Sequence, residues 1–221
     1  MNARVCVSAR ADTASKLAEH LVEAQRAGAD LVEARLDYLA SFSDIERIPG
    51  PLEIPTIAAL RMASEGGGFT GDEGSRIKLL ERAGEAGFSY LDVELGSKAL
   101  MSLKGKWDMI VSWHEFHSTP EAERLEEVLG QALSSGAEIV KIVTTALKSI
   151  DNISILRFLA RHSRSNKMVC FAMGEEGLPS RVLSPLFGAQ FTYASLRRGA
   201  ETAPGQIPLD ELRRIIGDLA P

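Results

Sequence analysis

The sequence is poor in cysteine and histidine, which limits the kinds of protein it can encode. It holds two cysteines and four histidines in 221 residues. Cys6 and Cys170 lie far apart in apolar segments, so they fit buried thiols better than a disulfide framework. No cluster of His and Cys has the spacing of a zinc site, and we expect neither a metal ion nor another cofactor. Reduced thiols are typical of a cytoplasmic protein, which is the location we expect.

The sequence also lacks long apolar segments and basic clusters. No stretch approaches about 18 consecutive apolar residues, so we expect no membrane span. The chain begins with Met1–Val7, which enters a strand-like segment and has no signal-peptide pattern. A net charge of −5 without a basic cluster argues against a nucleic-acid partner. Under this overall charge, an anionic ligand has to be held by individual arginines.

Strand-like and amphipathic segments alternate along the whole chain. The short runs expected to form strands are Arg4–Ser8, Leu31–Leu36, Thr56–Arg61, Tyr90–Leu95, Met109–His114, Glu138–Val143, Met168–Met173 and Gln190–Ser195. The clearest segments expected to form helices are Thr13–Ala27, Glu73–Ala86, Glu121–Ser134, Ser149–His162 and Leu209–Leu219. Shorter helices are expected at Ser43–Arg47, Ser97–Leu103 and Pro179–Phe187.

Residues at the ends of these helices support the assignment. Asp12 is expected to cap the first long helix, and Thr119 to cap the helix that follows Pro120. Three glycines lie just beyond helix ends, where a left-handed backbone favours glycine: Gly28, Gly87 and Gly136.

Eight strands that alternate with helices predict parallel pairing through right-handed crossovers. Eight is also the number of strands that closes a (β/α)8 barrel, or TIM barrel. Barrels of this length form one domain, so we expect residues 1–221 to be a single catalytic domain. An open doubly wound sheet is the alternative, although it usually has fewer strands.

Charged side chains alternate with apolar ones in several of the predicted strands. Glu33, Arg35 and Asp37 share one face of the second strand, and Asp92 and Glu94 share one face of the fourth. Parallel strands are normally apolar on both faces. Charges from several strands therefore indicate a polar pocket inside the barrel, unless the acids only form ion pairs with neighbouring arginines. An antiparallel sheet with one wet face would show similar alternation, but the intervening helices argue against it.

Lys141 lies within the β-branched segment Glu138–Val143, where an ammonium has to be paired, face water or lose its proton. A desolvated lysine can act as an amine nucleophile and form a Schiff base with a ketone or aldehyde. The simpler interpretation is a lysine that extends from a strand end to solvent. His114 ends the preceding strand and is expected beside Lys141. An imidazole there can remove a proton next to the imine carbon and return it to a leaving hydroxyl.

These motifs make the chain similar to the type I 3-dehydroquinate dehydratases, the Schiff-base enzymes of the shikimate pathway. The resemblance covers essentially the whole chain in the family's order. It is carried by Glu33–Asp37, Arg61 with Glu65–Gly67, Leu91–Leu95, Ser112–Phe116 before Thr119-Pro120, Val140–Ile142, Met173-Gly174 with Gly177 and Ser180-Arg181, Phe187-Gly188 and Ala203–Ile207.

The resemblance implies the reversible loss of water from 3-dehydroquinate to give 3-dehydroshikimate. It assigns the imine to Lys141, the general acid–base role to His114, and the orientation or tuning of His114 to Glu65. The implied substrate contacts are Glu33 and Arg35 at ring hydroxyls, Arg61 near them, Met173 against the ring, and Arg181 at the carboxylate with Gln206 and Thr202. The expected partners are therefore a small carboxylate substrate and, as a homodimer, a second copy of the chain.

Two features depart from the family pattern. Thr202 stands where the family usually has serine, so the hydroxyl is kept and a methyl is added. Many members begin with a β-hairpin that closes the floor of the barrel, whereas this chain enters its first strand directly. Neither departure affects the imine chemistry.

Two other functions fit part of the pattern. A class I aldolase shares the barrel and the lysine but usually needs a phosphate site. Arg197–Gly199 lies where many barrels bind phosphate, yet it better matches a mobile loop over the site. A binding barrel without chemistry is the second alternative, against which Lys141, His114 and Arg181 argue together. The glycine-rich segment Glu65–Arg76 lacks the lysine of a P-loop, which argues against a nucleotide site.

Overall fold

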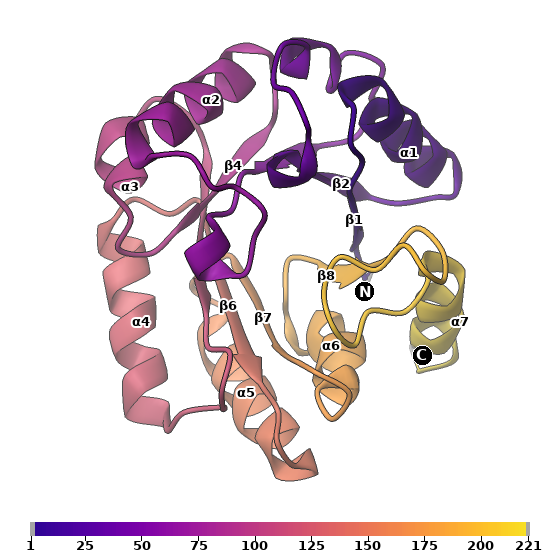
Figure 1. The fold of residues 1–221 in the computed structure, drawn as a ribbon. Helices are drawn as coiled ribbons and strands as arrows, with labels where there is room; N and C mark the ends of the chain where they lie inside the picture. Colours follow the sequence, from indigo (N-terminus) through magenta and orange to yellow (C-terminus); the bar gives the residue numbers. More distant parts are fainter. Residues whose placement is uncertain (1–2, 220–221) are drawn as a thin grey trace.

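Eight parallel strands form a barrel in the computed structural model, which describes residues 3–219 (Figure 1). The strands are β1 (Val5–Ala9), β2 (Leu31–Arg35), β3 (Thr56–Ala59), β4 (Tyr90–Glu94), β5 (Met109–His114), β6 (Ile139–Thr145), β7 (Met168–Met173) and β8 (Thr192–Ala194). Their hydrogen-bonded order is β7-β6-β5-β4-β3-β2-β1-β8. The order follows the chain around the ring without the reversal of a doubly wound sheet. The predicted (β/α)8 barrel is therefore confirmed.

Helices cover the outside of the strands (Figure 1). They are α1 (Ala14–Arg26), α2 (Glu73–Glu85), α3 (Lys98–Leu103), α4 (Ala122–Ser134), α5 (Ser149–His162), α6 (Leu178–Leu183) and α7 (Leu209–Leu219). Short 3-10 turns are η1 (Leu36–Tyr38), η2 (Ile45–Arg47), η3 (Ala63–Glu65) and η4 (Ser184–Phe187). Between β2 and β3 the chain uses only such turns. This explains why the sequence predicted no long helix between these two strands.

The barrel closes least tightly between β7 and β8. In the described part of the chain, β8 forms a ladder with β1 but none with β7. One backbone hydrogen bond, from Gln190 N to Met168 O at 2.7 Å, joins the two segments at their starts. Because β8 has only three residues, it cannot support a longer ladder. The seam lies under α6, whose main chain accepts a hydrogen bond from Thr192 Oγ1 at Arg181 O, 2.6 Å away.

The barrel interior changes from apolar to polar along the strands. A buried apolar cluster fills the lower part, and its members include Cys6, Leu31, Ile57, Ile110, Ile139, Val169 and Phe191, with Tyr90 partly buried against them. These side chains occupy the floor of the barrel, at the starts of the strands. Two residues further along several strands, the inward side chains are polar, as at Glu33, Asp92 and Lys141.

Two predicted helix caps are wrong, for local reasons. Thr13, not Asp12, caps α1: its Oγ1 accepts from Lys16 N at 3.3 Å, while Asp12 pairs with the Lys16 ammonium. Thr119 does not cap α4, because its hydroxyl is 2.8 Å from Thr144 Oγ1 and donates to Thr145 O at 3.0 Å. The three predicted left-handed glycines are confirmed, with φ of 93° at Gly28, 96° at Gly87 and 87° at Gly136.

Neither cysteine forms a disulfide. Cys6 and Cys170 are both free and buried, as the sequence predicted. Burial raises the pKa of each thiol, most strongly assisted at Cys6 by the charge of Glu33. Within residues 3–219, no helix is both long and apolar enough to cross a membrane.

Candidate active site

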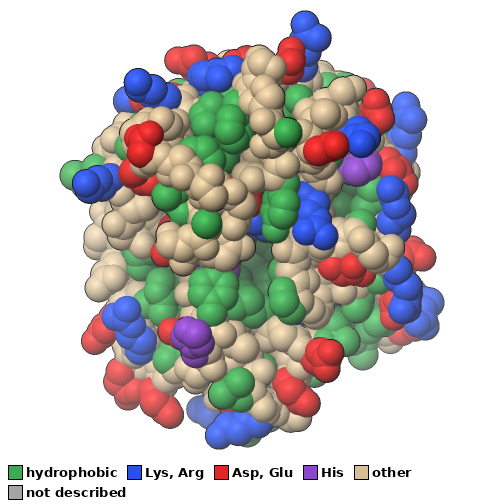
Figure 2. Space-filling view, viewed as in Figure 1, with side chains coloured by type: hydrophobic (Ala, Val, Ile, Leu, Met, Phe, Trp, Pro, Cys, Tyr) green, Lys and Arg blue, Asp and Glu red, His purple; other side chains and the backbone are tan. Residues whose placement is uncertain are grey.

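A cavity opens at the carboxyl ends of the strands, where barrel enzymes hold their catalytic groups. Figure 2 views the molecule from this end and shows a hollow near the centre, bordered by apolar side chains. The cavity is lined by Glu33, Arg35, Arg61, His114, Lys141, Val143, Phe171, Met173, Arg181, Tyr193, Thr202, Ala203 and Gln206. Nine of the ten residues that the sequence singled out therefore meet in one place.

Lys141 is paired with acidic side chains. A buried ammonium has to be paired, face water or lose its proton, and the structure shows the first of these three states. Its Nζ donates to Asp92 Oδ2 at 2.8 Å, to the Tyr193 hydroxyl at 3.0 Å and to Glu33 Oε2 at 3.3 Å. The side chain is only 7% exposed, so the simpler interpretation of a lysine extending to solvent is wrong. Lys141 lies opposite Ser112 in the ladder between β5 and β6, which directs its side chain into the barrel.

Asp92 holds two cations at once. Its Oδ1 accepts from Arg61 Nη2 at 2.9 Å and from Ser112 Oγ at 2.6 Å, while Oδ2 faces Lys141. Burial alone would raise the pKa of Asp92, but Lys141 and then Arg61 lower it further than burial raises it. Asp92 is therefore a fixed anion and a poor proton acceptor.

His114 lies above Arg61 at the rim of the cavity. Arg61 Nη1 is 3.1 Å from His114 Nδ1, and the imidazole stacks on Phe116 with ring centroids 5.9 Å apart. The pKa of His114 is held well below its ordinary value, first by desolvation and then by the positive charges of Arg61 and Lys141. Its ring keeps some contact with the cavity and stays neutral near pH 7. Because Arg61 can only donate, the contact leaves the imidazole proton on Nε2.

Glu65 does not line this cavity. It ends η3, is partly exposed, and faces a separate hollow together with Glu94, Arg76 and Ser97. Among the described residues, the hydrogen-bond partner of the His114 ring is Arg61 and not Glu65. Three glycines follow Glu65, and Gly67 packs so closely under Arg61 that a Cβ there would lie 2.2 Å from Arg61 O. Nothing in the sequence indicated where this tight turn would place the Glu65 carboxylate.

Arg181 is a buried cation that has no acidic partner within residues 3–219. Its Nη2 donates to Pro204 O at 3.1 Å, and its guanidinium lies 4.5 Å above the centre of the Phe171 ring. Its Nε is buried and makes no hydrogen bond. Burial lowers the pKa of Arg181 to about 10, since no carboxylate is near enough to oppose the desolvation. Such a group is suited to a ligand that brings its own negative charge.

The loop between β8 and α7 (residues 195–208, the β8–α7 loop) covers the cavity (Figure 1). Thr202 N donates to Gln206 Oε1 at 2.8 Å, and the Thr202 hydroxyl is 3.2 Å from Gln206 Nε2. Arg35 Nη1 donates to Thr202 O at 3.5 Å, while its Nε and Nη2 form a bidentate pair with Asp37 at 2.9 and 2.7 Å. Together with the Arg181 contact, two arginines of the cavity thus hold main-chain carbonyls of the loop.

Sequence reasoning missed one polar residue of the cavity altogether. Tyr193 contacts both Lys141 and Glu33 through its hydroxyl, yet a tyrosine in a strand is common and gave no signal. Its inward position follows from the alternation of β8, where Thr192 and Ala194 face outward. Asp92 was predicted to line a polar pocket or only to form ion pairs, and the structure shows its ion pairs with Arg61 and Lys141. The apolar walls formed by Val143, Phe171 and Ala203 were likewise not identified.

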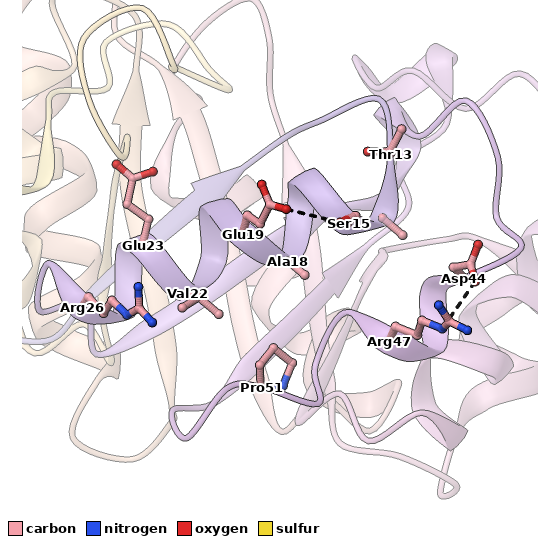
Figure 3. A pocket seen from close by; sticks show the side chains of 11 residues that line it. Thr13, Ser15, Ala18, Glu19, Val22, Glu23, Arg26, Asp44, Arg47 and Pro51 are labelled. Atoms are coloured by element: carbon pink, nitrogen blue, oxygen red, sulfur yellow. Dashed lines mark hydrogen bonds and ion pairs between the residues drawn. The ribbon is translucent and has the colours of Figure 1, made fainter.

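Another hollow lies beside α1, where apolar side chains such as Val22 and Pro51 are flanked by charged residues (Figure 3). Its polar groups pair along their own segments, as Ser15 does with Glu19 and Asp44 with Arg47. The arginines of the suspected phosphate segment are also occupied, Arg197 by Glu23 and Arg198 by Glu211. In residues 3–219 no group of three or more His, Cys, Asp or Glu residues could hold a metal ion.

A barrel that places a buried amine nucleophile one strand away from a neutral imidazole belongs to the class of imine-forming (β/α)8 enzymes. That class contains both dehydratases and aldolases. The family described as Type I 3-dehydroquinase matches residues 5–219, and the chain belongs to this family.

Known proteins agree with this assignment over the full length. A 3-dehydroquinate dehydratase of Dehalococcoides mccartyi is 39% identical, with 85% of each chain covered. One from Methanothermobacter thermautotrophicus is 36% identical, covering 100% of this chain and 99% of its own. The solved structure of 3-dehydroquinate dehydratase from Geobacillus kaustophilus superposes with a TM-score of 0.89 at 26% identity, covering 99% of this chain and 91% of its own. A dihydropteroate synthase from Stenotrophomonas maltophilia, at 13% identity and a TM-score of 0.63, shares the fold alone.

Proposed function

We propose that the cavity removes water from 3-dehydroquinate to give 3-dehydroshikimate, the reaction of the family and a step of the shikimate pathway. The substrate is a cyclic ketone that carries a carboxylate and hydroxyl groups. The reaction breaks a carbon–hydrogen bond next to the ketone and a carbon–oxygen bond one carbon further. An imine at the ketone carbon makes that hydrogen acidic, because the protonated imine accepts the electron pair.

Lys141 is the residue we assign to the imine. Its ammonium lies at the centre of the cavity floor, held by Asp92, Glu33 and Tyr193. Once Lys141 gives up a proton, its nitrogen can attack the ketone. Arg61 and Asp92 remain as a fixed ion pair beside it at 2.9 Å and stabilise the positive charge that stays on the imine nitrogen.

His114 is assigned to proton transfer. Its lowered pKa keeps it neutral, so it can accept the proton from the carbon next to the imine once its own proton has moved from Nε2 to Nδ1. As an imidazolium it can then protonate the leaving hydroxyl, which departs as water. Accepting a proton at Nε2 requires the resting proton to lie on Nδ1, facing an acceptor. We propose Glu65 as that acceptor, brought to His114 when the segment around η3 rearranges on substrate binding.

The observation that carries the substrate assignment is the missing counter-charge at Arg181. Each other buried cation of this end of the barrel faces a carboxylate: Arg35 faces Asp37, Arg61 faces Asp92, Arg76 faces Glu94, and Lys141 faces Asp92 and Glu33. Arg181 alone lacks one within the described residues, and its Nε has no partner. The substrate carboxylate supplies the negative charge that Arg181 lacks and an acceptor for its Nε.

The remaining residues are assigned to positioning the ring. Glu33 and Arg35 lie on the same face of β2, where they can bond ring hydroxyls, and Arg61 lies beside them. Thr202 and Gln206 face the cavity from the β8–α7 loop and add hydroxyl and amide groups near Arg181. Met173 lines the apolar wall against which the ring packs.

One experiment tests the reaction and the nucleophile together. Adding 3-dehydroquinate should produce the ultraviolet absorbance of a conjugated enone, and borohydride should then fix the ligand to the peptide that contains Lys141. A carbon–carbon cleavage product would instead point to an aldolase, and binding without turnover would point to a barrel that has lost its chemistry. An adduct on Lys148 in place of Lys141 would overturn the assignment of the nucleophile.

We also propose that the chain forms a homodimer through the start of α5. Ile150 and Ile153 expose 51% and 53% of their surface at a spacing that places them on one side of α5, and Leu147, just before the helix, exposes 66%. Light scattering should give a dimer for the parent protein and a monomer for the double variant Ile150→Glu/Ile153→Glu. Met101→Glu, at a more exposed apolar residue on α3, is the control that should remain dimeric.

A cytoplasmic location completes the proposal. Two free, buried thiols are compatible with a reducing compartment. Fractionation of cells that express the tagged chain should recover its activity in the cytoplasmic fraction.

A further inference from the structure

Tyr193 joins the proposed nucleophile to a carboxylate through a single hydroxyl. Its oxygen accepts from Lys141 Nζ at 3.0 Å and donates to Glu33 Oε2 at 2.7 Å. The direct contact between Lys141 and Glu33 is longer, at 3.3 Å. Each of the two hydrogen bonds made by the hydroxyl is therefore shorter than the direct contact between Lys141 and Glu33.

The surroundings fix the Tyr193 ring in this position. The side chain is buried, and its ring meets Phe191 edge-on at 5.5 Å and Phe171 at 6.2 Å between centroids. The Lys141 ammonium also lies 4.4 Å from the ring centre, so the ring itself attracts the cation. Because both neighbours are large aromatic groups, the hydroxyl has little freedom to leave Lys141 and Glu33.

The hydroxyl keeps its proton at rest. Burial raises the pKa of Tyr193 well above its ordinary value, and the negative charge of Glu33 raises it further. The phenol thus donates to Glu33 and accepts from Lys141 in a defined direction. Glu33 is itself held from the other side by Ser8 Oγ, at 2.7 Å from its Oε1.

Asp92 is the alternative proton acceptor for Lys141, but its environment argues against that role. Arg61 and Lys141 together lower its pKa below the ordinary value despite burial. A proton placed on Asp92 would leave Arg61 without its counter-charge. Glu33 has no arginine among its hydrogen-bond partners and can take up a proton with less loss of ion pairing.

From this arrangement we infer that Tyr193 positions the Lys141 amine and relays its proton to Glu33 during imine formation. This inference rests on the proposed function of Lys141. The Lys141 ammonium gives a proton to the Tyr193 oxygen while the Tyr193 hydroxyl gives its own proton to Glu33, so tyrosine is unchanged. The neutral amine attacks the ketone carbon, a nitrogen–carbon bond forms, and one amine proton passes to the former carbonyl oxygen. The proton on Glu33 then returns to that hydroxyl, which leaves as water and generates the protonated imine.

The test compares Tyr193→Phe with Tyr90→Phe, which removes a tyrosine hydroxyl at the opposite end of the barrel. Each protein is mixed with 3-dehydroquinate, quenched with borohydride after increasing times, and the adduct on Lys141 is measured by mass spectrometry. Tyr193→Phe should form the adduct more slowly by about 100-fold, the lower end of the range for a positioned proton-transfer group. Its final yield should match the parent protein, because the ring and the substrate contacts remain.

The pH dependence separates a relay from a structural role. In Tyr193→Phe the rate of adduct formation should recover as the pH is raised, since hydroxide can then remove the amine proton. Tyr90→Phe should match the parent protein at every pH. An unchanged rate in Tyr193→Phe, or a slow rate that does not recover with pH, would overturn the relay. Absence of any adduct in the parent protein would instead refute the proposed function.

Discussion

At the scale of single residues, Arg181 is the buried cation that has no carboxylate partner among the described residues. Arg181→Ala should weaken substrate binding by about 2–5 kcal/mol, the range for a desolvated charge pair that loses one member. Arg181→Lys should recover only part of this loss, because an ammonium lacks the bidentate fork. The dissociation constant can be measured by calorimetry in a Lys141→Ala background, where no imine forms. Arg197→Ala, which removes an exposed arginine paired with Glu23, is the control. Unchanged affinity in Arg181→Ala would shift the carboxylate site to Arg61 or Arg35.

His114 makes stability depend on pH in a predictable direction. The unfolded chain protonates this residue near the ordinary pKa of about 6.5, whereas the folded protein holds the pKa well below that value. Between the two values the unfolded state binds more protons, so the free energy of unfolding falls as the pH drops below about 6.5. Urea unfolding at pH 7 and pH 5.5 should show that the free energy of unfolding decreases less in His114→Gln than in the parent protein. In His117→Gln, which changes a residue on the exposed loop after β5, the free energy of unfolding should decrease as much as in the parent protein.

The sequence identified residues by their charge but not by their partners. Lys141 was recognisable because a cation in a buried strand needs an explanation, whereas Arg181 was assigned through the resemblance. Tyr193 was not recognisable, since a tyrosine satisfies the pattern of a strand whether or not its hydroxyl has a role. Glu65 was placed by resemblance alone, and the structure directs it away from His114, because the glycine-rich turn after η3 has many accessible conformations.

At the scale of elements, the β8–α7 loop depends on one close approach. Gly205 has φ of 74°, and a Cβ there would lie 2.4 Å from Gly174 O at the end of β7. Gly205→Ala should lift the loop, raise KM for 3-dehydroquinate and speed cleavage of the loop by protease. Gly199→Ala is a matched control, because φ is 81° but nothing lies within 4 Å of its Cβ. Equal effects of the two substitutions would show that backbone strain, and not the contact with Gly174, is responsible.

The bounds of the long helices were predicted almost to the residue, whereas two of the residues that cap their first turns were not. The predicted range Ser149–His162 agrees with α5 because its apolar spacing extends over the whole helix. At α1 two capping residues, Asp12 and Thr13, are adjacent, and the choice between them depends on the direction of the chain leaving β1. At α4 the Thr119 hydroxyl is drawn to β6, a contact that local sequence does not encode.

At the scale of the whole molecule, the number of predicted strands was enough to predict the barrel. It did not indicate where the barrel closes least tightly. The seam between β7 and β8 rests on a single backbone hydrogen bond, and β8 pairs along one edge only. Backbone amides of β8 should therefore exchange with solvent deuterium faster than those of β5 and β6, which are paired on both sides. Mass spectrometry of exchanged peptides measures this difference directly. Equal protection around the ring would mean that side-chain packing against α6 closes the seam as firmly as a ladder does.

The arginine contacts of the β8–α7 loop have a kinetic consequence. Arg35 and Arg181 hold the carbonyls of Thr202 and Pro204 in the free protein, and the proposed substrate contacts use the same two cations. Under the proposed function, a substrate molecule that reaches the closed loop finds both guanidinium groups already engaged with the loop, so it binds only after the loop has moved. Association is then slower than diffusion allows, and at high substrate concentration the observed rate levels off at the opening rate of the loop. The arginines that favour a bound carboxylate thus also set the frequency with which the barrel admits one.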